Sequence, residues 1–299
     1  MTDPTGRDWP EIPREMIELY DEYTHLALDR RGFMANLSLL AGGTAAAQAV
    51  LPLIAANSAL AAVVAENDPR LVAEEVTWPG AGGAMTGYLA KPAEAAGPLP
   101  GIVVIHENRG LNGHIRDVAR RAALEGYVVL APDFLAPGGG TPEDEDAARA
   151  AIQALDRAAL GENLAGSATF LRGRDDATGA VGVMGFCWGG GNALRLAVSD
   201  PALGAAVAYY GAQPPAEDVP AIKARLMMHY AGLDERINEG IPAFEAALRA
   251  AGTRYEIFVY DGVNHAFSND TSAARHDAAA AALAWERTFG LFGAALAPG

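Results

Sequence analysis

The stretch Gly185-Phe186-Cys187-Trp188-Gly189-Gly190 decides how the rest of this chain is interpreted. It follows an apolar run at 180–185 and precedes a run of helical character at 193–198, so it occupies a turn between a strand and a helix. A side chain at the apex of such a turn strains the backbone, and glycines two residues before and after it relieve the crowding. The following helix points its N-terminus at Cys187, where it stabilises a thiolate. The pattern therefore predicts a nucleophile elbow with cysteine at its apex.

Strand-like and helix-like patterns alternate on both sides of this elbow, from about residue 66 onward. The runs 102–105 and 128–130 are continuously apolar, which is typical of strands buried on both faces. Eight strands are predicted, at 71–78, 86–91, 101–106, 127–131, 180–185, 205–210, 226–230 and 255–260. Apolar residues recur at helical spacing after Asn112, in the stretch that ends at Gly252, and in 277–292, and each of these stretches predicts a helix. This alternation predicts a mostly parallel central sheet flanked by helices, with the first two strands as an antiparallel edge.

A cysteine nucleophile needs a base, and the base needs an acid that orients it. In the α/β-hydrolase fold these residues follow in the order nucleophile, acid, histidine, from loops at the C-terminal ends of strands. Asp234 and His265 each follow a predicted strand in that order. His25 is assigned to the N-terminal segment instead, and His229 to the interior of a strand. The sequence therefore predicts an α/β-hydrolase fold with Cys187, His265 and Asp234 as its catalytic triad.

The stretch His106-Glu107-Asn108-Arg109-Gly110 closes the third predicted strand. In this fold the loop after that strand supplies one oxyanion donor, and the residue after the nucleophile supplies the other. The backbone N–H groups of Asn108 and Trp188 are the expected donors. The pair His106-Glu107 and the nearby His114 lack the spacing of a metal-binding motif, and no cysteine or acidic cluster completes a ligand set. Neither a metal nor another cofactor is expected.

Composition narrows the classes of function. The chain has 299 residues, of which 51% are hydrophobic and 20% charged, as suits a folded protein with a substantial core. Its formal net charge of -15 repels phosphate backbones, so nucleic acid is not an expected partner. Cys187 is the only cysteine, so no intrachain disulfide can form. A lone cysteine is most often a small buried apolar side chain, and only the elbow around Cys187 favours a nucleophile.

The first 65 residues differ from the rest of the chain. Asp29-Arg30-Arg31-Gly32-Phe33-Met34 precedes a stretch at 35–65 without charged side chains, and 59–61 reads small-x-small. This arrangement resembles a twin-arginine export signal and favours a periplasmic over a cytoplasmic location. The alternative, favoured by Asp29 before the arginine pair, is a helical arm that packs on the domain and stays attached. We therefore divide the chain into an N-terminal extension, 1–65, and an α/β-hydrolase catalytic domain, 66–299.

A stable membrane span is not expected in this extension. Polar and helix-breaking residues interrupt its apolar run and weaken it as a membrane helix. These residues are Gly42, Gly43, Gln48, Pro52 and Asn57.

Several of these features occur together in one known family. The elbow at 185–190, Glu107 after the third strand, Asp234 and Asn264-His265-Ala266-Phe267 make residues 70–292 resemble the dienelactone hydrolase (carboxymethylenebutenolidase) family. The resemblance implies that Glu107 holds the resting thiol away from the histidine. Substrate binding then frees the carboxylate to take the thiol proton, and the thiolate attacks an ester or lactone carbonyl. The resemblance also implies that water activated by His265 hydrolyses the resulting thioester.

The chain departs from that family where the substrate is recognised. The dienelactone enzymes hold the substrate carboxylate with two arginines, but Asn269 stands at one of these positions and the loop 132–137 has no arginine for the other. Dienelactone is therefore not the expected substrate, and an uncharged or larger ester remains open. The candidate substrate contacts, each also explicable as a core or solvated residue, are Arg109, Phe134, Trp188, Tyr209, Tyr210, Arg236, Phe267 and Asn269.

The function expected from the sequence is hydrolysis of a small-molecule ester, lactone or thioester. One alternative is a catalytically silent scaffold that binds a ligand or a protein. Another is a different hydrolysis on the same triad, of a peptide or an organophosphate, because fold alone does not fix the reaction. The sequence makes no prediction of oligomeric state.

Overall fold

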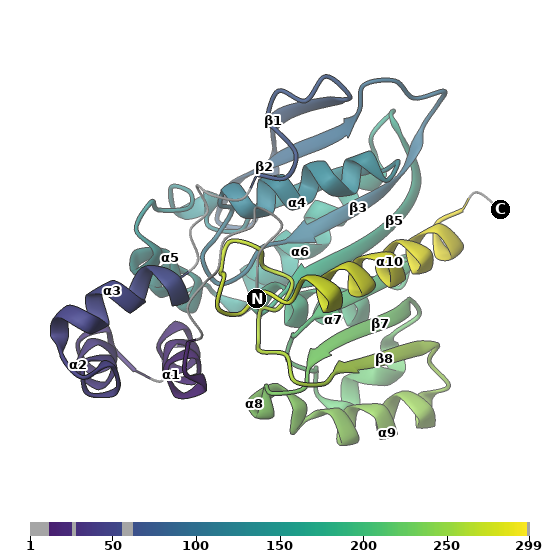
Figure 1. Cartoon of the computed structure of the whole chain (residues 1–299). Coiled ribbons are helices and arrows are strands. Elements are labelled where there is room, and N and C mark those ends of the chain that lie inside the picture. The colour runs from purple at the N-terminus through teal and green to yellow at the C-terminus, as the bar shows by residue number, and fades with distance from the viewer. Residues whose placement is uncertain (1–11, 26–27, 56–61, 298–299) are drawn as a thin grey trace.

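The computed structural model describes residues 12–25, 28–55 and 62–297 (Figure 1). A sheet of eight strands runs through the molecule in the order β1-β2-β4-β3-β5-β6-β7-β8. The strands are β1 (Leu71–Gly80), β2 (Gly83–Pro92), β3 (Leu99–Ile105), β4 (Val128–Asp133), β5 (Ala177–Phe186), β6 (Ala205–Tyr209), β7 (Arg225–Ala231) and β8 (Tyr255–Tyr260). All eight predicted strands are confirmed.

Strand direction also follows the prediction. β1 pairs antiparallel with β2, and β2 pairs antiparallel with β4, whereas the remaining neighbours pair in parallel. The β1–β2 hairpin turns through Ala81 and Gly82, and Gly82 has a φ of +79°, which glycine adopts without steric cost. The parallel strands therefore end at one edge of the sheet, where the loops that carry chemistry gather.

Helices cover both faces of the sheet and bury alternate residues of its strands. Val103 and Ile105 belong to the core beneath α6, α7 and α9, whereas Ile102 and Val104 belong to the core beneath α4 and α10. Successive side chains of a strand point to opposite faces of the sheet. Because both faces are covered here, odd and even positions of the strand must both be apolar. The helices of the domain are α4 (Gly113–Leu124), α5 (Glu145–Gln153), α6 (Arg157–Arg172), α7 (Trp188–Ser199), α8 (Glu235–Asn238), α9 (Ile241–Ala251) and α10 (Ala278–Ala295).

Local sequence sets where the predicted helices begin and end. Asn112 Oδ1 accepts a hydrogen bond from the Ile115 N–H at 3.1 Å, so Asn112 caps α4 as expected. Asp277 caps α10 in the same way through the Ala280 N–H at 2.8 Å. α9 ends at Gly252, whose φ of +67° suits a left-handed C-cap.

The N-terminal residues 12–25 and 28–55 form the helices α1 (Arg14–Thr24), α2 (Arg30–Ala41) and α3 (Thr44–Ile54). We call these described residues the N-terminal arm; it lies beside α5 (Figure 1). Phe33 and Leu37 are buried in a small core that belongs to the arm. Asp29 caps α2 through the Gly32 N–H at 2.7 Å, so the arginine pair begins a helix. The small-x-small triplet at 59–61 lies outside the described residues.

Within the described part of the chain, no single helix has the length and apolar character needed to cross a membrane. α2 and α3 meet those criteria only when taken together, and the pair is bent by 107°.

Candidate active site

Cys187 lies between the end of β5 and the first residue of α7, with a φ of +55°. Few residues with a side chain adopt this backbone conformation, which marks a strained turn. A Cβ added at Gly185 would lie 2.1 Å from the Gly189 carbonyl oxygen, and one added at Gly189 would lie 2.4 Å from that of Ile105. The two glycines are therefore required by the close approach of backbone on either side of the thiol.

Asp234 and His265 meet at the same end of the sheet, after β7 and β8. The carboxylate of Asp234 can only accept, so His265 Nδ1 donates to its Oδ2 at 2.5 Å. A ring nitrogen of His265 lies within 4.8 Å of Cys187 Sγ. Because Nδ1 is bound to Asp234, Nε2 is the nitrogen free to face the thiol. The structure thus brings the three predicted triad residues together.

The charges of this group favour an ion pair between thiolate and imidazolium. Burial raises the pKa of the Cys187 thiol, but the charges that His265 and His25 carry when protonated, together with their hydrogen bonds to sulfur, outweigh it and lower that pKa below its ordinary value. Burial lowers the pKa of His265, but the Cys187 thiolate and the hydrogen bond to Asp234 raise it overall. The two groups are coupled, and each stabilises the charged form of the other.

His25 brings a second imidazole to the thiol from the C-cap of α1. Its Nε2 lies 3.4 Å from Cys187 Sγ, and its Nδ1 lies 2.6 Å from the carbonyl oxygen of Asp21. In the sequence His25 belongs to the N-terminal segment, and no role in the site is predicted for it. No motif joins His25 to the elbow, which lies 162 residues further along the chain, so only the fold reveals the contact.

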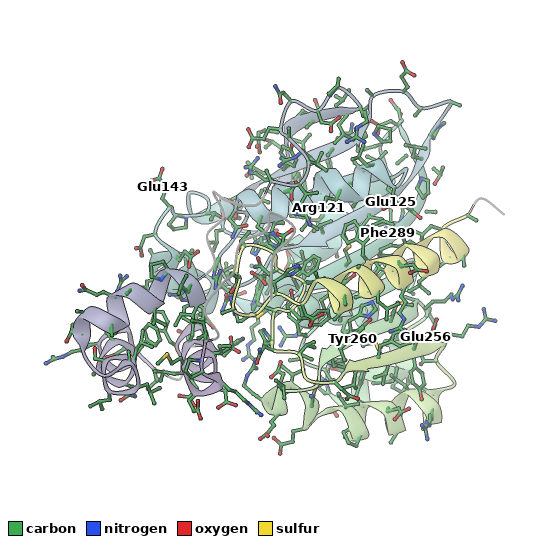
Figure 2. All side chains as sticks on the ribbon, in the orientation of Figure 1. Arg121, Glu125, Glu143, Glu256, Tyr260 and Phe289 are labelled. Carbon is green, nitrogen blue, oxygen red and sulfur yellow. The ribbon has the colours of Figure 1, made fainter. Side chains whose placement is uncertain are left out.

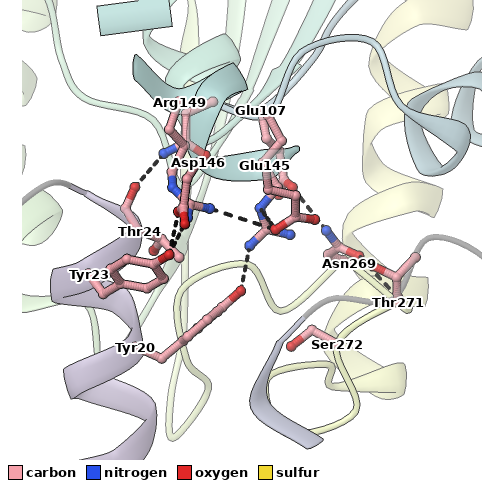
Figure 3. Close-up of polar contacts among 12 residues, drawn as sticks. Tyr20, Tyr23, Thr24, Glu107, Glu145, Asp146, Arg149, Asn269, Thr271 and Ser272 are labelled. Carbon is pink, nitrogen blue, oxygen red and sulfur yellow. Dashed lines mark hydrogen bonds and ion pairs between the residues drawn. The ribbon is translucent and has the colours of Figure 1, made fainter. Parts of the chain in front are cut away.

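Glu107 is buried in the loop after β3. Its Oε2 accepts a hydrogen bond from Asn269 Nδ2 at 3.0 Å (Figure 3). Burial raises the pKa of Glu107, but Arg109, His114 and Arg275 lower it overall, so the carboxylate is charged. The resemblance implies a resting contact between Glu107 and the thiol. In the described part of the chain Glu107 instead bonds to Asn269, and the thiol faces His25.

Residues near the end of α1 tie the N-terminal arm to the rim of this site. Tyr20 Oη accepts from Arg109 Nη2 at 3.2 Å, and the carbonyl oxygen of Thr24 accepts from Asn108 Nδ2 at 2.7 Å (Figure 3). Asp21 Oδ1 accepts from Arg275 Nη1 at 3.0 Å. These bonds hold the segment that carries His25 over the thiol.

Comparison with known proteins identifies the family of this chain. A sequence model of the dienelactone hydrolase family matches residues 85–296. The chain belongs to the dienelactone hydrolase family.

Relatives within this family support the assignment. A provisionally named carboxymethylenebutenolidase of Escherichia coli O157:H7 is 32% identical over 247 residues, covering 78% of this chain and 91% of that protein. The crystal structure of a provisionally named dienelactone hydrolase from Klebsiella pneumoniae subsp. pneumoniae MGH 78578 has 29% identity and a TM-score of 0.68, covering 75% of this chain and 98% of that chain. A dienelactone hydrolase-like promiscuous phosphotriesterase from metagenomic libraries has 25% identity and a TM-score of 0.70, covering 76% and 99% of the two chains.

The two backbone groups expected to stabilise an oxyanion in this dienelactone hydrolase relative lie on adjoining segments. Trp188 is the first residue of α7, so its N–H has no acceptor within the helix. Asn108 lies in the turn that the Gly110 N–H closes on the Glu107 carbonyl at 3.3 Å. The end of β3 packs on the first turn of α7, which places both segments beside the thiol.

Some aromatic side chains from the predicted set lie near the three predicted triad residues, and others pack elsewhere. The Tyr210 ring lies 4.9 Å from that of His265, and the Phe267 ring packs on Tyr210 at 5.6 Å. Phe134 and Trp188 pack edge to face at 6.0 Å. Tyr209 instead bonds to Thr288 in the core beneath α10.

The predicted polar contacts differ in how free they are to meet a substrate. Arg109 is buried and bound to Tyr20, and its Nε lies 3.5 Å from Glu145 Oε2. Asn269 is also buried, and it bonds to Glu107 and Thr271. Arg236 is exposed on α8. Burial raises the pKa of Asp234, but the hydrogen bond from His265 and the charges of His265 and Arg236 lower it overall.

His106 and His114, which lack the spacing of a metal-binding motif, each contact a different neighbour. His106 Nδ1 donates to the Glu107 carbonyl oxygen at 2.6 Å, and His106 Nε2 lies 3.4 Å from the backbone nitrogen of Phe134. His114 Nδ1 lies 3.3 Å from Asp270 Oδ1. His229, as predicted, is packed inside the sheet and bonds to Tyr260 and Thr288.

Two cavities flank the site without reaching the thiol. One of about 240 Å³ lies between the N-terminal arm and α5, with Tyr20, Phe33 and Arg149 in its lining. Another of about 660 Å³ lies along α4 and α10, near the labelled Arg121, Glu125 and Phe289 (Figure 2). Cys187 lines neither, in keeping with the cover that the arm provides.

Proposed function

We propose that this chain hydrolyses a small carboxylic ester or lactone, with Cys187 as nucleophile, His265 as base and Asp234 as the acid that orients it. The observation that carries the proposal is the 2.5 Å bond between Asp234 and His265, which turns the free nitrogen of His265 toward a thiol at a strained elbow. Membership of a hydrolase family supports the reaction class.

The reaction begins with the Cys187 thiolate. Sulfur attacks the acyl carbon, and the developing oxyanion accepts hydrogen bonds from the backbone N–H groups of Asn108 and Trp188. The carbonyl re-forms as the bond to the alcohol oxygen breaks, and His265 gives its proton to that oxygen. His265 then takes a proton from water, whose oxygen attacks the thioester. Breakdown of this second intermediate releases the acid and restores the thiolate and imidazolium.

Glu107 acts in this proposal as the group that controls the charge of the thiol. Arg109, His114 and Arg275 keep its carboxylate ionised, and a nearby negative charge disfavours a second one on sulfur. Where Cys187 still carries its proton, a shift of Glu107 from Asn269 toward the thiol on substrate binding would let the carboxylate accept that proton and supply the thiolate. That shift would break the bond from Asn269.

The substrate we propose is a small ester, lactone or thioester without the carboxylate of dienelactone. Asn269 stands where the family has one carboxylate-binding arginine, and its amide is engaged by Glu107 and Thr271. Arg109 and Arg275 are cations near the site, but Tyr20 and Asp21 already bind them. A phosphotriester is the second candidate, because a structural relative at 25% identity is named for that activity.

A substrate panel tests the proposal. The purified chain is assayed with p-nitrophenyl acetate and butyrate, dihydrocoumarin, a thioester, dienelactone and paraoxon, before and after treatment with iodoacetamide. We expect hydrolysis of an uncharged ester or lactone that alkylation abolishes, with little turnover of dienelactone. Turnover that survives full alkylation of Cys187 would overturn the cysteine mechanism. Binding without any turnover would favour the silent scaffold.

A further inference from the structure

We propose that His25, Cys187 and His265 form a three-ligand site for a thiophilic divalent cation of the zinc class, and that such a cation silences the nucleophile. The one sulfur and two nitrogen atoms offered by these residues all lie within 4.8 Å of one another. The silencing rests on the proposed function, whereas the binding of the cation does not.

The tautomer of His25 follows from its hydrogen bond. His25 Nδ1 lies 2.6 Å from the carbonyl oxygen of Asp21, and a carbonyl can only accept, so Nδ1 carries the proton. In the neutral imidazole Nε2 then has a lone pair, and this nitrogen lies 3.4 Å from Cys187 Sγ. The backbone of α1 therefore turns a metal-binding nitrogen toward the thiol.

The tautomer of His265 follows in the same way. Its Nδ1 donates to Asp234 Oδ2, so in the neutral ring the Nε2 lone pair lies on the side of the thiol, and in the imidazolium Nε2 carries the proton that a cation would displace. His265 is 4% exposed, and within the described chain its Nε2 is buried without a hydrogen-bond partner. A buried polar atom of this kind needs a partner, and a proton or a cation would supply it.

Two ring nitrogens face one sulfur, and a single thiol proton can satisfy only one of them. A thiol shared between two lone-pair nitrogens donates to one and leaves the other facing sulfur. A thiolate facing a neutral imidazole likewise sets a lone pair against a negative sulfur. A second proton would relieve this arrangement, and so would a cation bound between the three atoms.

The geometry is close to what zinc requires. Zinc–sulfur bonds of about 2.3 Å and zinc–nitrogen bonds of about 2.0–2.1 Å place tetrahedral ligand atoms about 3.3–3.6 Å apart. The Sγ–Nε2 distance of 3.4 Å to His25 already falls in that range, and every pair lies within 4.8 Å. Side-chain rotations that close about 1 Å complete the site and leave its fourth position to water.

Further hydrogen bonds orient both imidazoles as in protein zinc sites. Zinc-bound histidines usually donate their other ring N–H to a carboxylate or a backbone carbonyl, and here Asp234 and the Asp21 carbonyl fill those roles. The bonds from Arg275 to Asp21 and from Asn108 to Thr24 hold the segment that carries His25. When the cation binds, the proton shared by sulfur and His265 leaves to solvent, and the bound sulfur can no longer attack a carbonyl.

The binding test uses the full-length chain after removal of metal with a chelator. Zn²⁺ is titrated by calorimetry against a competing chelator, and Co²⁺ is added to detect the thiolate-to-cobalt charge-transfer band. We expect one ion per chain, a charge-transfer band that Cys187→Ser removes, and an affinity that His25→Phe lowers at least about tenfold. His276→Gln is the matched control, because His276 bonds to the Phe267 carbonyl outside the cluster and should leave the affinity unchanged.

Equal Zn²⁺ affinity in the wild type and His25→Phe would overturn the proposal, as would a cobalt spectrum without the charge-transfer band. If His25→Phe does not fold, zinc-edge X-ray absorption of the wild type decides instead: one sulfur, two imidazole nitrogens and one water oxygen are expected, and a shell without the sulfur or with fewer than two imidazoles overturns the site. Hydrolysis of the best ester is then measured with added Zn²⁺, and we expect inhibition at the calorimetric affinity that EDTA reverses. If no substrate is hydrolysed, the proposed function fails while cation binding is still measured; if esters are hydrolysed and Zn²⁺ does not bind, only this inference fails.

Discussion

The imidazole rings of His25 and His265 meet edge to face, with their centroids 4.8 Å apart and their planes at 88°. One ring comes from the loop after β8 and the other from the end of α1, so the N-terminal arm takes part in the candidate site. The thiol of Cys187 lies against both rings, and its reactivity should depend on residues from both ends of the chain.

The first prediction concerns the nucleophile. Cys187→Ala should fold, because it removes only a sulfur atom from a partly buried position, yet it should hydrolyse no ester. Cys187→Ser should retain a trace of activity at most, since a hydroxyl needs a stronger base than a thiol. Intact mass after iodoacetamide should show one added group in the wild type and none in either variant. Full turnover by folded Cys187→Ala would exclude the mechanism.

The second prediction concerns the orienting acid. Asp234→Asn keeps the size of the side chain but favours the wrong tautomer of His265, because an amide can donate to Nδ1. We expect kcat to fall on the order of 10³–10⁴-fold with little change in KM. Exposed Asp261→Asn, in the loop after β8, is the control and should retain activity. A loss of less than about tenfold would mean that another group orients His265.

The third prediction concerns Glu107. Glu107→Gln can still accept from Asn269, but it removes the negative charge that faces Arg109 and Arg275. We expect the free energy of unfolding to fall by about 1–3 kcal/mol, because buried cations lose a partner. Turnover should fall on the order of 10²-fold, because a proton acceptor is lost, and iodoacetamide should react faster with Cys187, because the thiolate is no longer disfavoured.

Kinetics on the same preparation separate the two possible roles of Glu107. Glu125→Gln, which removes a charge from a residue that bonds to Trp285 away from the site, is the matched control. A Glu107→Gln enzyme with lower stability but unchanged turnover and alkylation would leave Glu107 a structural acid.

The sheet was predictable because its signals are local. The runs 102–105 and 128–130 are apolar at every position, and the fold explains this by two separate cores on the two faces. The elbow was predictable for a related reason: Gly185 and Gly189 are imposed by backbone contacts within a few residues of Cys187 and by the end of β3. The order of Asp234 and His265 along the chain then followed from the fold.

The contacts of the N-terminal arm were not predictable in this way. His25, Asp21 and Thr24 contact residues that lie far away along the chain, and none of them belongs to a motif. The same holds for Asn269, whose sequence position suggested a substrate contact but whose amide is buried against Glu107. Tertiary hydrogen bonds of this kind leave no periodic signal in the sequence.

The fourth prediction concerns how the arm is held. Asp146 on α5 accepts hydrogen bonds from Tyr23 of the arm and from Arg149 (Figure 3). It also accepts one from Arg30 of the arm. Burial raises the pKa of Asp146, but these three partners lower it below its ordinary value of 3.8. A carboxyl with a depressed folded pKa stabilises the docked arm above its unfolded pKa and loses that effect as pH falls through the folded one. The arm should therefore be firmly docked at neutral pH and loosen below about pH 4.

Hydrogen–deuterium exchange of peptides from α1 measures this docking. Asp146→Asn should raise their exchange at neutral pH, whereas the exposed Glu143→Gln should not. Below about pH 4, after correction for intrinsic exchange, the wild type should approach the variant. Identical protection of α1 in the wild type and Asp146→Asn at neutral pH would show that other contacts hold the arm.

The last prediction concerns the fate of the arm in the cell. We propose that residues 1–65 direct export through the Arg30-Arg31 pair and that the mature chain begins near 62–66. Cleavage there would remove His25 and free Arg109, Arg275 and Asn108 from their bonds to the arm. The mature enzyme would then have an open site with two of the three proposed cation ligands. A chain that keeps the arm would have a covered thiol instead.

Intact mass of the protein from the periplasm and cytoplasm of its native host distinguishes these forms. Replacing both Arg30 and Arg31 by lysine should stop export if the pair is read as a signal, because that recognition depends on the arginines themselves. The same change should leave the location unaltered if the pair only begins α2, since lysine preserves its charge near Asp146. An extracytoplasmic protein that retains residues 1–60 would contradict cleavage. Retention in a cytoplasmic protein would instead favour the attached helical arm, with His25 as a permanent member of the site.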